Sequence, residues 1–176
     1  MDTRTDRRVR RTRQALVDAL LALMAEKPYD HITVHELSDR ADVGRSTFYG
    51  HFVDKDALLD TALDELRTIA ASPRPSHGLS LSLLTHIAEH RQLAAAILGP
   101  PGATTVAHKV RDVVEQAVAG SFADLIPTGG LPPKAYICYI TGAYLALVQW
   151  WLEDGQSVPA AELDRFFRQA TSSAFR

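Results

Sequence analysis

The stretch TVHELSDRADVGRSTFYGHF, Thr33 to Phe52, decides the fold expected for the first part of the chain. It opens with a capping box, in which Thr33 and Glu36 satisfy each other's backbone N–H groups at a helix start. The tripeptide DVG, 42 to 44, then interrupts the helix after about two turns, and a second short helix follows at once. Two short helices joined by a tight turn that contains glycine predict a helix-turn-helix.

A rotation of about 100° per residue separates the faces of the second short helix. Phe48 and Phe52 fall on one face, which we expect to point into the core. Ser46 and Gly50 point directly away from it. Arg45 and Tyr49 lie on one flank between these faces, and Thr47 and His51 lie on the other.

The outward ridge of Ser46 and Gly50 is therefore the smallest part of this helix, and long polar side chains border it. That shape suits a helix whose backbone must approach another surface closely. The major groove of B-DNA admits an α-helix, and its phosphate walls accept hydrogen bonds from such polar side chains. An ordinary corner between two helices gives the same pattern, so both readings remain open on these residues alone.

Helical spacing of apolar residues continues through the rest of the 176-residue chain. Clusters of breaker residues, rich in proline and glycine, separate the helical segments. They occur at 26–31, 72–78, 99–102, 127–133 and 153–159. The apolar stripes are Leu16, Leu20, Leu23, Met24; Leu58, Leu59, Ala62, Leu66, Ile69; Val106, Val110, Val113, Val114, Ala117, Val118; and Leu163, Phe166, Phe167, Ala170. No alternating run indicates a strand, so we expect an all-α protein of about eight or nine helices.

Charge is distributed unevenly along the chain. The net charge is −2, yet residues 1–13 contain six arginines against Asp2 and Asp6, a local charge of +4. Such a basic end suits a polyanion, although a solvated helix face has the same composition. The single cysteine, Cys138, excludes an internal disulfide, and no apolar leader follows the basic start. We therefore expect a cytoplasmic protein.

The longer stretch TVHELSDRADVGRSTFYGHFVDKDALL, Thr33 to Leu59, resembles the helix-turn-helix signature of TetR-family transcriptional regulators. The resemblance covers roughly Thr12 to Leu63, and weakly includes WWLEDG near the C-terminus. It implies a three-helix DNA-binding domain, predicted at 1–53, and a helical ligand-binding and dimerisation domain at 54–176. The implied function is a ligand-responsive repressor that binds a palindromic operator in double-stranded DNA as a homodimer, and not an enzyme.

The resemblance also implies roles for single residues. Thr33, Tyr49, His51 and Lys55 match positions that grip backbone phosphates, and Arg45, Ser46 and Thr47 match positions near base edges. Arg45 is long enough to pair bidentately with guanine. Gly44 replaces the serine that often caps the recognition helix, and Gly50 replaces a bulkier residue. We include Gly50 in the DNA-facing surface as a point of close approach.

The segment 134–153 is apolar nearly all round. One side can pack on its own core and another needs a second partner. Together with 160–174 it would form the four-helix interface of a homodimer, as the family does. A helix wholly buried in the monomer is one alternative. A membrane span is another, although the length is at the lower limit for one and we expect no membrane association.

An effector would bind between the C-terminal helices, and its identity cannot be inferred from the sequence. The candidate contacts are His86, Tyr136, Tyr139, Tyr144 and Trp150, each of which also suits a core or interface position. We expect no cofactor and assign no metal ligand.

An alternative to the function of a ligand-responsive repressor rests on the sequence HIAEH, residues 86–90. Its H-x-x-E-H spacing is that of one class of metallopeptidases and places His86, Glu89 and His90 on one helix face. It also suits a metal-sensing regulator, with His77 or His108 as further ligands. A hydrolase would need a third protein ligand beside a cleft, and no second matching element is present.

Overall fold

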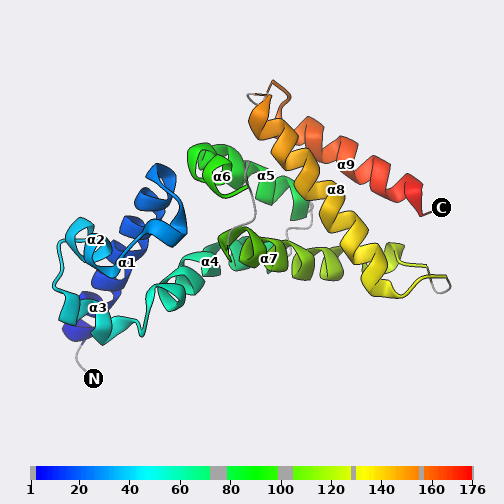
Figure 1. The fold of residues 1–176 in the computed structure, drawn as a ribbon. Helices are drawn as coiled ribbons and strands as arrows, with labels where there is room; N and C mark the ends of the chain where they lie inside the picture. Colours follow the sequence, from blue (N-terminus) through cyan, green and yellow to red (C-terminus); the bar gives the residue numbers. More distant parts are fainter. Residues whose placement is uncertain (1–2, 72–78, 99–104, 128–129, 155–156, 176) are drawn as a thin grey trace. The chain divides into compact units, whose positions relative to one another are not determined.

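The computed structural model describes residues 3–71, 79–98, 105–127, 130–154 and 157–175. These residues form α-helices and short 3-10 helices, and no strand occurs among them, which confirms the all-α prediction (Figure 1). The chain divides into two compact units, 1–65 and 66–176. This division falls inside a helix that begins at Lys55. The functional boundary between residues 53 and 54 stays a prediction.

The first unit contains a bundle of helices around one apolar core. Its elements are α1 (Thr3–Glu26), η1 (Tyr29–His31), α2 (Val34–Arg40), α3 (Arg45–His51) and the first part of α4 (Lys55–Ala71). α2 packs on α1 and on α3. The predicted stripe on α1 is buried throughout, and Leu37, Phe48, Leu58 and Leu59 complete the core at 0 to 1% exposure.

The turn between α2 and α3 contains glycine, as expected, but the residue with left-handed backbone is not the glycine. Asp42 takes the left-handed conformation, with φ of 53°. Gly44 has φ of −71° and ψ of 150° and is the N-cap of α3, without a side-chain hydrogen bond. Aspartate is one of the few residues that tolerate left-handed backbone, so a glycine is not required at position 42.

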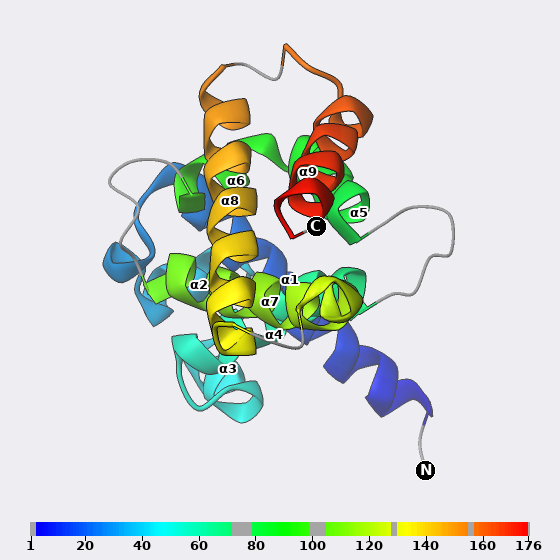
Figure 2. The ribbon, with the colours of Figure 1, turned by 90° about the vertical axis from the view of Figure 1, so that its right-hand side faces the viewer.

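The second unit contains the remaining helices. They are α5 (Leu79–Glu89), α6 (Arg91–Leu98), α7 (Thr105–Ser121), η2 (Ala123–Leu125), α8 (Pro133–Glu153) and α9 (Ala160–Ala174). α8 packs on α7 and α6, whereas α9 packs mainly on α5 (Figures 1 and 2). All six residues of the stripe predicted on α7 are buried.

The apolar stripe predicted for α9 is only partly correct. Leu163 and Phe167 are buried, but Phe166 is 57% exposed and Ala170 is exposed as well. Thr171 completes the buried face with the spacing i, i+4, i+8, so the core contact is narrower than the stripe. Phe166 and Ala170 are therefore left on a second apolar face.

Most of the predicted breaks are compatible with the helix bounds. α1 ends at Glu26, at the start of the cluster 26–31, and η1 lies within that cluster. The clusters 72–78 and 99–102, together with His77 and parts of 127–133 and 153–159, lie outside the described residues.

α8 covers the segment for which a membrane span is one alternative. Among the described residues it is the one helix long and apolar enough to cross a bilayer, and 33% of its apolar window is buried. Ile140, Tyr144, Val148 and Trp151 form its inner face, at 0 to 3% exposure. A helix packed against α6 and α7 in this way satisfies the same length and composition test without entering a membrane.

Candidate nucleic-acid interface

The start of α2 is held by the predicted capping box. The Thr33 N–H donates to Glu36 Oε2 at 3.0 Å, and the Glu36 N–H donates to Thr33 Oγ1 at 3.3 Å. Lys27 also donates to the Glu36 carboxylate. These bonds, that of Lys27 first, lower the pKa of Glu36 to about 2. The exposed Thr33 side chain is therefore fixed in place at the helix N-terminus.

α3 has the two faces that the helical rotation predicted. Phe48 is 0% exposed and Phe52 is 4% exposed, with ring centroids 6.0 Å apart. On the other side, Tyr49 is 59% exposed. The remaining predicted contacts on α3 are exposed Arg45, Ser46, Thr47 and Gly50, and half-buried His51. The structure thus brings seven of the eight predicted residues, Thr33 included, onto α3 and the neighbouring start of α2.

Gly50 has no packing role within the described part of the chain. A Cβ atom built on Gly50 would meet no atom within 4 Å. The φ range that favours glycine is not needed either, because Gly50 lies inside the regular helix α3. Neither sterics nor backbone conformation therefore explains a residue that weakens a helix by roughly 0.5–1 kcal/mol relative to alanine.

The eighth residue, Lys55, points into its own unit. Its Nζ donates to the carbonyls of Tyr29 at 3.0 Å and Ile32 at 3.1 Å, with Asp30 O at 3.5 Å. The ammonium also lies 4.4 Å from the centroid of the Tyr29 ring. Lys55 thus closes the loop that carries η1. The neighbouring Asp54 caps α4 as expected, accepting from the Ala57 N–H at 2.8 Å.

Arg13 supports α3 in a way that the sequence did not reveal. Its guanidinium lies 4.5 Å from the Phe52 ring centroid. Nη1 donates to the His51 carbonyl at 3.2 Å, and Nη2 donates to Thr61 Oγ1 at 3.4 Å. Arg13 therefore links α1 to the end of α3 and to α4. Its partners lie 38 and 48 residues away, so the arginine-rich composition of 1–13 was the one signal available.

The predicted effector contacts are distributed over different surroundings in the second unit. Tyr136 and Tyr139 both pack edge-on against Phe175, at 5.4 and 5.7 Å. Tyr144 is buried, packs on Phe167 and donates to Ser80 O at 3.2 Å. Burial, followed by the charge of nearby Asp164, raises its pKa. The remaining two candidates are Trp150, which is 45% exposed on α8, and half-buried His86 on α5.

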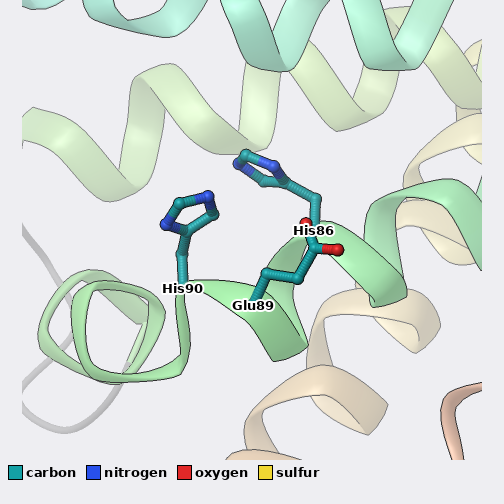
Figure 3. A group of neighbouring side chains, drawn as sticks. All are labelled: His86, Glu89 and His90. Carbon is teal, nitrogen blue, oxygen red and sulfur yellow. The ribbon is translucent and has the colours of Figure 1, made fainter.

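The residues of the H-x-x-E-H motif do come together. His86, Glu89 and His90 offer one ligand atom each, and these atoms all lie within 4.8 Å of one another (Figure 3). Within the described residues, this is the one such group of three or more metal-ligating side chains. His108, a possible further ligand, is exposed on α7 and does not join the group.

A groove lies between the outer faces of α8 and α9. It has a volume of about 360 Å³. Tyr139 and Phe166, each 57% exposed, border it on opposite helices. The other lining residues are Ala143, Ala146, Leu147, Phe167, Ala170 and Thr171. The surface left open is therefore almost entirely apolar.

Comparison with known proteins places this arrangement in a family. The chain is 28% identical over 177 residues to the uncharacterized HTH-type transcriptional regulator YxbF of Bacillus subtilis, covering 93% of this chain and 45% of that protein. It is 34% identical over 73 residues to the HTH-type transcriptional regulator TcmR of Streptomyces glaucescens, covering 40% of this chain and 32% of that protein. The chain thus spans less than half the length of these curated relatives.

The fold is shared with a solved structure of similar size. A TetR transcriptional regulator from Streptococcus agalactiae superposes with a TM-score of 0.77 at 23% identity, covering 95% of this chain and 97% of that one. Residues 16–62 match the model of bacterial regulatory proteins of the tetR family, and residues 76–173 match that of a transcriptional regulator C-terminal region. The chain therefore belongs to the TetR family of bacterial transcriptional regulators.

Proposed function

We propose that the chain is a cytoplasmic repressor that inserts α3 into the major groove of its operator DNA. The observation that carries the proposal is the outer face of α3, where polar side chains flank a ridge that lacks a side chain at Gly50. The inner face of the same helix is fixed by Phe48 and Phe52. A helix held on one side and open on the other suits readout of base edges.

In this proposal, the residues of α3 and Thr33 at the start of α2 have different roles in binding. Arg45, Ser46 and Thr47 face base edges, while Thr33, Tyr49 and His51 contact phosphates on the groove walls. Lys55 has its ammonium on three carbonyls, so we assign it the positioning of the loop before α2. Exposed arginines on α1 would add phosphate contacts; they are Arg7, Arg8, Arg10 and Arg11.

The proposed homodimer forms through the groove of α8 and α9. Phe166 is 57% exposed there, and a large exposed apolar side chain beside an apolar groove is typical of an interface. A second copy of the chain fits because a two-fold axis brings the same groove to itself. Two copies of α3 would then read a palindromic operator.

We further propose that an effector bound in the second unit shifts the DNA affinity of the dimer. His86, Tyr136, Tyr139, Tyr144 and Trp150 remain its candidate contacts. Family membership supports this regulation, and the effector's chemical class is left open. The hydrolase alternative is not retained, since both family matches are to regulatory proteins.

Arg45→Ala tests the proposal at the base edges. We expect it to relax base preference at a single position per half-site, because a bidentate arginine contributes about 1–3 kcal/mol of discrimination. The measurement is the affinity for all single-base variants of a selected site. If Arg45→Ala discriminates between bases as strongly as the unmodified chain at every position, the proposed role of Arg45 is wrong.

Tyr49→Phe tests the proposed contact between Tyr49 and a phosphate on the groove wall. A hydrogen bond to a charged phosphate is worth about 1.5–3 kcal/mol, so we expect at least about tenfold weaker binding to specific and random DNA alike. Thr85→Val is the control, because it removes an exposed hydroxyl from α5 in the second unit. Equal affinities for Tyr49→Phe and the unmodified chain would argue against α3 as the DNA-facing helix.

A further inference from the structure

We propose that His86, Glu89 and His90 form a binding site for a zinc-class divalent cation at the junction of α5 and α6. One ligand atom of each residue lies within 4.8 Å of the others. The two imidazole centroids are 4.6 Å apart, with their planes tilted by 50°. Figure 3 shows the two rings side by side and Glu89 leaving the same end of α5. All three residues belong to the second unit, whereas the proposed DNA-facing residues belong to the first.

Hydrogen bonds hold the main chain in place at the junction that carries the proposed ligands. The His90 N–H donates to His86 O at 3.1 Å, which continues the last turn of α5. The His90 carbonyl accepts from the Ala94 N–H at 3.0 Å, at the start of α6. Next to it, Arg91 Nη2 donates to Leu152 O of α8 at 2.7 Å. The backbone of His90 is therefore held from both sides.

The ligand chemistry selects the cation. Zinc binds histidine nitrogen and carboxylate oxygen at about 2.0–2.2 Å, which places ligand atoms about 3.3–3.6 Å apart in a tetrahedron. Exposed Glu89 and His90 have room to rotate to that spacing. Two imidazoles favour zinc, copper or nickel, whereas magnesium and calcium prefer oxygen ligands throughout. Three protein ligands leave a fourth position for water or a small molecule.

A chance grouping of surface side chains is the competing explanation. Single exposed histidines near carboxylates do occur elsewhere in this chain, as with His35 and Asp39 on α2, whose Nδ1 and Oδ2 lie 3.1 Å apart. That pair has the same one-turn spacing but lacks a second imidazole. The three-ligand group at the junction should therefore bind zinc more tightly than such a pair does. His35 provides the matched control.

The test is zinc binding by the full chain, purified without a histidine tag and stripped with a chelator. The proteins to compare are the unmodified chain, Glu89→Gln, His90→Gln and the control His35→Gln. Zinc ions alone are titrated by calorimetry, and cobalt absorption in the visible region reports a site containing nitrogen ligands. Far-UV circular dichroism verifies that each variant remains helical, which we expect because Glu89 and His90 are exposed.

We expect one zinc ion per chain for the unmodified protein and for His35→Gln. Loss of a residue that merely supports a metal ligand lowers affinity about 10–100-fold, so losing a ligand itself should cost at least about tenfold. Glu89→Gln and His90→Gln should both show this loss, and His90→Gln should lose the cobalt bands. Less than a tenth of a zinc ion per chain, or unchanged affinity in folded His90→Gln, would overturn the proposal. No DNA is present, so the result is independent of the proposed operator binding.

Discussion

Gly50 carries the most specific claim at the scale of single residues. Space around its Cβ position and its regular helical backbone leave no internal reason for glycine. We therefore expect Gly50→Ala to raise the free energy of unfolding by roughly 0.5–1 kcal/mol. The added methyl group should weaken operator binding, because it would protrude from the ridge that we propose approaches the groove floor. Urea unfolding and DNA titration measure the two effects, and unchanged or tighter binding would remove the proposed reason for the glycine.

Glu36 predicts a pH dependence of stability. Its native pKa, about 2, lies below the usual value of about 4.3 in an unfolded chain. The carboxylate therefore contributes stability that is fully present above the unfolded value and is lost as pH falls through about 2. Glu36→Gln lacks this contribution. We expect the two urea midpoints to differ by a constant amount above about pH 5 and to converge at lower pH; parallel curves down to pH 2 would contradict the assignment.

Single residues also mark where prediction from sequence stops. The capping box of Thr33 and Glu36 and the inward turn of Phe48 were predictable, because partners within four residues are fixed by helix geometry. Arg13 was not, since its contacts with Phe52 and Thr61 join separate helices. The left-handed backbone of Asp42 was not predicted either, because the tripeptide DVG does not show which of its residues makes the turn.

At the scale of elements, Lys55 distinguishes a positioning residue from a DNA contact. Its ammonium bonds the carbonyls of Tyr29 and Ile32, which would lose a charged donor in Lys55→Met. We expect the first unit to lose about 1–3 kcal/mol of stability, the cost of leaving part-buried acceptors unpaired.

The salt dependence of DNA binding separates the two roles of Lys55. Each phosphate that a cation neutralises contributes about 0.9 to the slope of log affinity against log salt concentration. Lys55→Met should keep the slope of the unmodified chain. A decrease of about that size in folded Lys55→Met would show that the ammonium leaves its carbonyls for a phosphate.

α8 and α9 make the second prediction at this scale. Phe166 lies 57% exposed beside their shared groove. Phe166→Glu would place a charge in the proposed dimer contact, so we expect light scattering to give twice the chain mass for the unmodified protein and a single chain mass for the variant. Val53→Glu, at an 80% exposed apolar residue after α3, should remain dimeric. A monomeric unmodified chain would refute this interface.

Helix periodicity predicted where the helices lie in the sequence better than it predicted which of their residues are buried. The stripes on α1 and α7 are buried as expected, since each of these helices has a single apolar face. α9 has two, and spacing alone cannot tell that Phe167 packs on Tyr144 while Phe166 lies outside. Four of the five effector candidates lie on α8 and His86 lies on α5, and neighbours far away in the sequence give them different surroundings.

At the scale of the whole molecule, the proposed division of labour agrees with the two family matches, because one lies in each unit. The local charge of +4 in residues 1–13 belongs to the first unit, and the apolar groove of α8 and α9 belongs to the second. The first unit thus contains a locally basic segment, and the second contains an apolar groove. This is the organisation that a dimeric regulator needs.

In-vitro selection from a random DNA pool tests the central claim most directly, because it uses the unmodified chain and presupposes no operator. We expect enrichment of a palindrome whose half-sites lie about one helical turn, or a multiple of it, apart. That result would support the DNA-facing α3 and the two-fold dimer together. Failure of any sequence to be enriched, with the chain folded and at low salt, would contradict the account.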